Sequence, residues 1–142
     1  PGRTPRLLEK PMDMLRRTQR TILDELLTAL PVHDAAHGFI GGRSVVTGAA
    51  VHTGQQVVVT ADLTSFFASI TAPTVYGVFR SAGFAEPLAH VLTGVCTHRV
   101  PVHVLSAMPD GGSPEERQVL RGMLRAAHLP QGAPTSPALA NT

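Results

Sequence analysis

A proline-rich segment near the end of this chain, LPQGAPTSP at residues 129–137, constrains the fold more than any other stretch. Three prolines and a glycine within nine residues force a rigid, shaped loop, because proline fixes the backbone φ angle and lacks an N–H donor. The loop leaves Gln131, Thr135 and Ser136 as fixed hydrogen-bonding groups. The alternative, an ordinary proline-rich connector, would not demand this order of residues.

The remaining sequence predicts helices joined by loops. Apolar residues at spacings of three, four and seven predict an amphipathic helix that follows Pro11 and stops at Pro31. The glycine-rich stretch 38–44 is expected to be a loop, and residues 97–112 an irregular one. Ser44 and Ser113 are expected N-caps, the latter with Pro114 and Glu116 in the first turn. Further helices are predicted over 44–52, 73–81, 85–96, 113–128 and from 136 onwards.

A run of three valines at residues 57–59 predicts a strand covered on both faces, and Asp62 lies at its end. Burying a carboxylate there is costly unless a positive group meets it, and a divalent metal ion is one such partner. The alternative is an aspartate that caps the next turn. Phe66 and Phe67 follow closely enough to wall a pocket over Asp62, although both could be core residues, Phe66 in particular.

Composition favours a globular cytoplasmic protein. The chain has 142 residues, of which 43% are apolar and 15% charged, and its pI near 9.4 leaves a mildly basic surface that tolerates a polyanion. Cys96 is the only cysteine, so no internal disulfide can form, and no apolar run approaches the roughly 20 residues that cross a bilayer. Cys96 lies near His98 and His103, but no second ligand pair has zinc spacing. We expect no membrane partner and no zinc.

Four blocks of the sequence, in order, resemble the bacterial retron-type reverse transcriptases. VTADLTSFFASI resembles the motif that carries the first catalytic aspartate, and LPQGAPTSPALAN the downstream motif with a glutamine in the nucleotide pocket. RLLEKP followed by LRRTQRTIL is similar to the fingers segment, and AHGFIGGRSVVTGAAVH to the next block. Gly48 departs from the Asn-Ala-x-x-His element usual in retron enzymes. The resemblance covers nearly the whole chain except the region 97–128.

The resemblance implies an α+β fold, namely the fingers and an incomplete palm of a right-hand polymerase. Residues 1–55 would be fingers, 56–96 the first palm segment, 97–128 an insertion-like region, and 129–142 the nucleotide-pocket loop with the start of a helix. The chain begins without Met and stops before the expected Tyr-x-Asp-Asp hairpin. We therefore interpret it as a fragment at both ends.

The resemblance also implies the site residues. Asp62 would be the catalytic carboxylate that binds two Mg²⁺ ions, with the backbone carbonyl of Leu63 as a further ligand and other ligands from sequence outside this chain. Phe67 would be the ring that discriminates between sugars, Gln131 would line the incoming nucleotide, and Arg6 would contact its triphosphate. Arg3 is a weaker candidate for the same contact.

The implied function is an RNA-directed DNA polymerase that adds dNTPs to a primer 3′-hydroxyl by two-metal phosphoryl transfer. Its expected partners are an RNA template with a DNA or RNA primer, dNTPs, and, as a further candidate, a structured non-coding RNA. The fragment alone should be inactive, because one carboxylate cannot hold two ions. Two alternatives stay open: a non-catalytic RNA-binding module on a degenerate polymerase scaffold, and a small α/β enzyme that uses Asp62 as an isolated acid or metal ligand.

Overall fold

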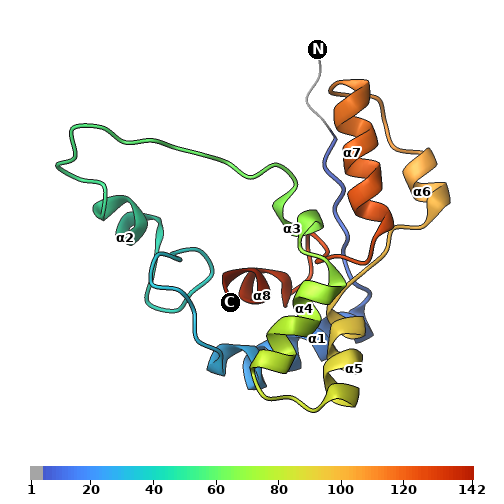
Figure 1. Cartoon of the computed structure of the whole chain (residues 1–142), viewed down its shortest axis with the longest axis horizontal. Coiled ribbons are helices and arrows are strands. Elements are labelled where there is room, and N and C mark those ends of the chain that lie inside the picture. Colours follow the sequence, from blue (N-terminus) through green and yellow to red (C-terminus); the bar gives the residue numbers. More distant parts are fainter. Residues whose placement is uncertain (1–4) are drawn as a thin grey trace.

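The computed structural model describes residues 5–142, which form helices joined by irregular segments (Figure 1). Within these residues there is no strand, and extended pairing is limited to two isolated bridges of His128 with Thr71 and His98. None of the described helices combines the length and apolar character needed to cross a membrane. In chain order the helices are α1 (Asp13–Glu25), η1 (Leu27–Ala29), α2 (Val45–Ala50), α3 (Phe66–Ser69), α4 (Ala72–Ser81), α5 (Glu86–Cys96), α6 (Val102–Ser106), α7 (Pro114–Arg125) and α8 (Ser136–Asn141).

The helices predicted from local signals are confirmed, but two of them end earlier than expected. The first ends at Glu25 and is followed by the short η1, and the one expected to reach residue 128 ends at Arg125. The Ser44 hydroxyl accepts a hydrogen bond from the backbone N–H of Thr47, and the Thr47 hydroxyl accepts one from the backbone N–H of Ser44. Ser113 and Glu116 form the same reciprocal capping box at the start of α7, where Pro114 is the first helical residue. Each box satisfies backbone donors that the first turn of a helix leaves unpaired, and so it fixes where the helix begins.

Two apolar clusters hold the described chain together. In the first, α1 and the α4–α5 pair enclose Phe79, whose ring meets Phe84 edge-on with the ring centroids 5.8 Å apart. Leu129 and Leu139 bring the proline-rich loop and α8 against the same cluster. The second cluster lies under α6 and α7 and consists of Ala68, Val100, Leu105, Leu120 and Leu124. The loop at 129–131 therefore starts from a residue buried in the first cluster.

The strand expected over residues 57–59 is not formed, so that prediction is wrong and the α+β class is not confirmed. The three valine side chains are 78%, 55% and 86% exposed, and residues 51–63 run as a long arch away from the helices (Figure 1). A two-sided strand needs flanking strands that complete its hydrogen-bond ladder and apolar layers that cover its faces. No segment among residues 5–142 provides either of them.

The region 97–112 is also less irregular than expected. Helix α6 begins directly after Pro101, whose fixed φ angle suits a helix start, and its Leu105 is buried in the second cluster. The short amphipathic turn VHVLS was too brief to give a periodic signal. Residues 97–128 therefore pack as a helical pair, α6 against α7, that forms one wall of the second cluster.

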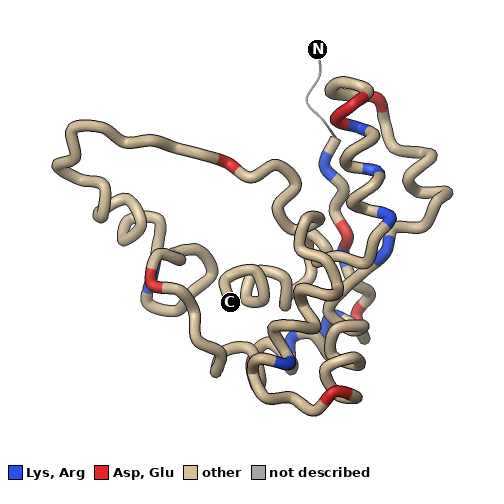
Figure 2. The backbone as a smooth tube through the Cα atoms, in the orientation of Figure 1, with Lys and Arg blue, Asp and Glu red and all other residues tan. Residues whose placement is uncertain are grey.

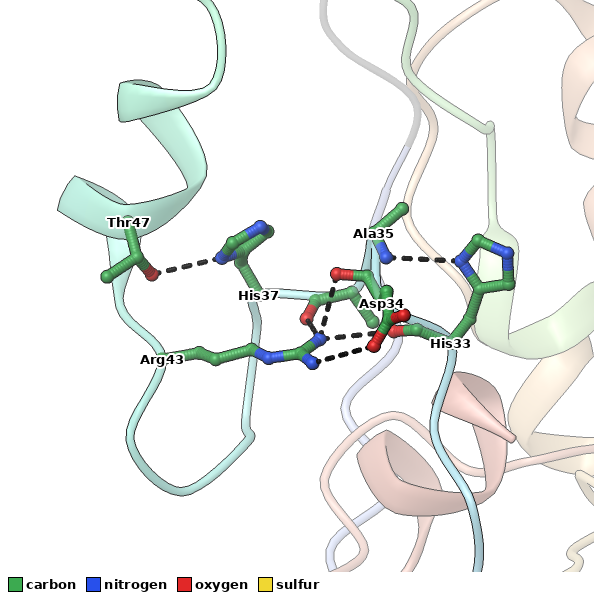
Figure 3. A network of polar contacts seen from close by, with 7 residues as sticks. His33, Asp34, Ala35, His37, Arg43 and Thr47 are labelled. Carbon is green, nitrogen blue, oxygen red and sulfur yellow. Dashed lines mark hydrogen bonds and ion pairs between the residues drawn. The ribbon is translucent and has the colours of Figure 1, made fainter.

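The glycine-rich loop before α2 is held closed by one arginine (Figure 3). The Arg43 guanidinium donates hydrogen bonds to the backbone carbonyl oxygens of His33, Asp34 and Ala36 at 3.1, 2.9 and 2.6 Å, and it also contacts the Asp34 carboxylate at 3.3 Å. Asn141 of α8 donates to the carbonyl oxygen of Gly38 at 2.7 Å. These bonds give the loop a defined shape and link it to the last helix, although it contains no regular element.

Candidate functional site

A cavity of about 350 Å³ brings together three stretches that are far apart in the sequence. Its walls come from the N-terminal segment, from residues 62–68 including most of α3, and from α7 with the start of the proline-rich loop. The N-terminal segment runs alongside α7 in Figure 1. All five site residues expected from the sequence line this cavity, namely Arg6, Asp62, Leu63, Phe67 and Gln131.

Asp62 lies at the exposed edge of the cavity. Its carboxylate has no hydrogen-bond or ion-pair partner within residues 5–142, and the helix that follows begins after Ser65 without any side-chain cap. The alternative in which Asp62 caps the next turn is therefore not what the structure shows. The carboxylate remains available to a ligand.

Phe66 is the more exposed ring of the phenylalanine pair, although it was the one more expected to be a core residue. Phe66 is 39% exposed, whereas Phe67 is half-buried and packs against the first cluster. Their ring centroids lie 5.9 Å apart with the planes tilted by 41°. Ser65 adopts the left-handed region, with φ at 53°, and this sharp turn brings both rings to the cavity wall. Phe67 thus has a supported ring that faces the same space as Asp62.

Two of the three polar side chains expected in the proline-rich loop are buried, and one of them stabilises the loop by an internal hydrogen bond. Thr135 and Ser136 are buried, and the Ser136 hydroxyl donates a 2.8 Å hydrogen bond to the carbonyl oxygen of Pro130. Ser136 is thus a fixed hydrogen-bonding group, as expected, but its bond lies within the loop. Gln131 alone of the three lines the cavity, and it is half-buried.

Lys and Arg residues occur on both the N-terminal segment and α7 (Figure 2), and Arg6 supplies positive charge at the cavity. It is exposed and has no hydrogen-bond or ion-pair partner among the described residues, so its guanidinium is free to bind an anion. Arg3, the weaker candidate for this contact, lies outside the described residues.

Sequence reasoning missed a buried acid–base pair beside the cavity. Glu9 Oε1 lies 3.0 Å from Nε2 of His128, whose side chain is fully buried. Burial alone would lower the pKa of His128, but hydrogen bonds to Glu9 and to the Ala126 carbonyl, with the attraction of the Glu9 charge, raise it overall. Glu9 Oε2 is buried without a hydrogen-bond partner, and Nε2 of His98 lies 3.9 Å away.

The oxygen donors of the cavity fit a magnesium site only in part. The Asp62 carboxylate and the Leu63 carbonyl are ligands of the kind that Mg²⁺ prefers, and both residues line the cavity. However, no group of three or more His, Cys, Asp or Glu side chains within residues 5–142 is placed to hold a metal ion. The described residues can thus supply some ligands of a metal site but not a complete set.

The known proteins that we report as similar to this chain are all retron reverse transcriptases. No protein-family model matches the chain. The chain is similar to the retron Mx162 and retron Mx65 reverse transcriptases of Myxococcus xanthus, with 38% and 40% identity over 96% of its length. It is also similar to the retron Ec86 reverse transcriptase of Escherichia coli, with 30% identity over 99% of its length. The chain spans 26%, 30% and 36% of these three proteins, respectively.

Proposed function

Because this chain is a segment of a retron-type reverse transcriptase, we propose that the full-length protein containing it is an RNA-directed DNA polymerase. It would extend a primer 3′-hydroxyl with dNTPs on an RNA template. The observation that carries the proposal is the shared cavity. Residues from three separate stretches, assigned to the site by motif alone, line one cavity. They include the carboxylate of Asp62 and the guanidinium of Arg6, neither of which is bound to another group among the described residues.

Asp62 would hold the catalytic metal ions, with the backbone carbonyl of Leu63 as a second oxygen ligand. Two bound Mg²⁺ ions would activate the primer 3′-hydroxyl and stabilise the charge that develops at the α-phosphorus. The further carboxylates that such a site requires would come from parts of the full-length protein outside this segment. The exposure of Asp62 supports this role, because its carboxylate is not already committed to another group.

The other cavity residues would bind the incoming nucleotide. Arg6 would pair its guanidinium with the triphosphate, since a planar fork of donors matches phosphate oxygens. Gln131 would contact the nucleotide from the rigid loop. Phe67, packed against the first cluster, would place a fixed ring where a ribose 2′-hydroxyl would otherwise fit.

The segment by itself would not polymerise. One carboxylate offers too little negative charge for two divalent ions, and residues 5–142 contain no cluster that completes the site. The proposed activity therefore belongs to the full-length protein, and this segment contributes the nucleotide pocket and one metal ligand.

The test is primer extension by the full-length protein on an RNA template, with Mg²⁺ and dNTPs. We expect synthesis that Asp62→Ala abolishes and that Asp24→Ala, at an exposed aspartate in α1, leaves unchanged. Synthesis that survives Asp62→Ala would remove the assigned role of this residue. Absence of synthesis, with tight binding of the primed RNA, would instead identify a non-catalytic RNA-binding module.

A further inference from the structure

The N-terminal segment that carries Arg6 lies on the protein in an extended conformation. Residues 5–10 alternate between half-buried and exposed positions, with Pro5, Leu7 and Glu9 facing inward. Leu7 packs against the second cluster. Glu9 occupies the third inward position, where an apolar residue would continue the pattern, and its side chain is 7% exposed. A charged group in that place needs a specific partner.

Glu9 is fixed to the proline-rich loop by its main chain and its side chain. Its backbone N–H donates a 2.9 Å hydrogen bond to the carbonyl oxygen of Gln131, and its carboxylate meets His128 at 3.0 Å. The two backbones are in close approach, because a Cβ atom added to Gly132 would lie 3.4 Å from the Glu9 carbonyl oxygen. The segment and the loop are thus held together at one residue.

His128 is itself held at a rigid junction. Its backbone N–H and carbonyl both pair with the backbone of His98, at 3.0 and 2.9 Å. Its neighbours in the chain, Ala127 and Leu129, bond to the backbone on either side of Thr71 at 2.8 and 2.9 Å. The backbone position of His128 is therefore fixed by these hydrogen bonds. A residue that binds the imidazole is held in a defined position against the protein core.

The hydrogen-bond partners of the ring define its protonation. Nδ1 lies 2.7 Å from the carbonyl oxygen of Ala126, and Nε2 lies 3.0 Å from a Glu9 carboxylate oxygen. The carbonyl oxygen and the ionised carboxylate can only accept hydrogen bonds. Both ring nitrogens must therefore carry a proton if both hydrogen bonds are to form. When the ring loses a proton, one of its two nitrogens presents a lone pair to an acceptor, and the ring also loses its charge attraction to the Glu9 carboxylate.

We propose that Glu9 and His128 are positioning residues that clamp the N-terminal segment onto the proline-rich loop and so set Arg6 against Gln131 for nucleotide binding. This inference rests on the function proposed above. Arg6 precedes Glu9 by three residues, and Gln131 follows His128 by three, so the clamp joins the two walls near their nucleotide-binding residues. Releasing it would let Arg6 move relative to the loop, which would weaken nucleotide binding before it affected the chemical step.

The clamp should make nucleotide affinity depend on pH. The ionisable groups around the pair are His98, near Glu9 Oε2, and Arg6 and Asp62, which line the same cavity as Glu9. Lys10 lines a second cavity together with Glu9 and His98. Protonated His128 keeps the clamp closed. As the pH rises through the raised pKa of His128, the clamp opens and KM for the dNTP increases.

The test measures KM for the dNTP and kcat of the full-length protein from pH 6 to 9. We expect Glu9→Ala to raise KM about tenfold at pH 6, the effect of losing one charge-assisted hydrogen bond, with kcat little changed. We expect Glu9→Gln to restore a low KM at every pH, because an amide can donate to the Nε2 of a neutral ring. Above the pKa of His128, the Glu9→Gln variant should thus bind dNTP better than the wild type.

Matched controls come from an exposed pair of the same residue types on α5. Glu86 and His90 lie 3.8 Å apart with both side chains about two-thirds exposed, and Glu86→Gln and His90→Gln should leave the KM profile unchanged.

If Glu9→Ala does not fold, the comparison of the wild-type and Glu9→Gln profiles still tests the clamp. Polymerase activity with a KM that does not change with pH, or a Glu9→Gln profile that follows the wild type, would overturn the clamp alone. Absence of any Mg²⁺-dependent synthesis by the wild type would overturn the proposed function, and the clamp with it.

Discussion

The side-chain amide of Gln19 donates a 2.8 Å hydrogen bond to the backbone carbonyl oxygen of Val95, and so joins α1 to the last turn of α5. Gln19 is only 1% exposed, and its Oε1 has no hydrogen-bond partner among the described residues. A buried amide that is half satisfied contributes both a bond and a desolvation cost. The stabilising part is the bond to Val95 together with the volume that the side chain fills.

Substitutions of Gln19 should therefore separate the contribution of its hydrogen bond and packing from the cost of its unpaired oxygen. We expect Gln19→Ala to lower the free energy of unfolding by about 2–4 kcal/mol, because it removes the bond and leaves a cavity. Gln19→Met keeps the volume and removes the unsatisfied oxygen, so its loss should be no more than about 1–2 kcal/mol. Chemical denaturation of the full-length protein measures both. Gln118→Ala, at an exposed glutamine of α7, is the control, and equal losses for Ala and Met would contradict the packing contribution.

Phe79 should be the most sensitive position of the first cluster. It is fully buried and meets Phe84 edge-on, where the chain turns from α4 to α5. Phe79→Ala should cost about 3–5 kcal/mol, because a large cavity opens between helices that pack closely. Val91→Ala, at an exposed position of α5, should cost less than about 1 kcal/mol. A Phe79→Ala variant that unfolds at the wild-type denaturant concentration would show that this cluster does not hold α4 and α5 together.

The predictions from sequence held where the determining interactions are local. Ser44 and Ser113 mark helix starts because their partners lie three residues away, within the same turn. The valine run at 57–59 gave no strand, because a strand depends on partner segments that its own residues do not specify. The cavity residues could be grouped only through the resemblance of motifs. Glu9 and His128 are separated by 119 positions, and no local pattern connects them.

Cys96 should resist thiol reagents in the folded protein. Burial raises the pKa of its thiol to about 11, so almost no reactive thiolate is present at pH 8, and the side chain is fully enclosed. We expect no alkylation of Cys96 by iodoacetamide at pH 8 in the native state and complete alkylation in denaturant, read by peptide mass spectrometry. Rapid native labelling would mean that the end of α5 opens readily.

The stability of the protein should fall relative to Glu9→Gln as the pH rises. The folded pKa of His128 is raised above its ordinary value, so the stabilisation by the Glu9–His128 pair is fully present below about pH 6.5. It is lost as the pH rises through the folded pKa. The difference in Tm between the wild type and Glu9→Gln should therefore shrink or reverse from pH 6 to pH 9. Glu86→Gln provides the baseline, and a difference that grows with pH would have the wrong sign for this pair.

Phe67 should control the choice between deoxyribonucleotides and ribonucleotides. Its ring is held against the first cluster and lines the cavity with Asp62, so it would occupy the space that a 2′-hydroxyl needs. In the full-length protein, Phe67→Ala should raise kcat/KM for rNTPs relative to dNTPs by roughly tenfold to a hundredfold, a range typical of removing one steric contact. Competing single-nucleotide incorporation assays measure this ratio. Phe66→Ala is the matched control, because that ring lies four residues after Asp62 and is more exposed. An equal change in both variants would mean that the pair shapes the cavity without excluding a particular sugar.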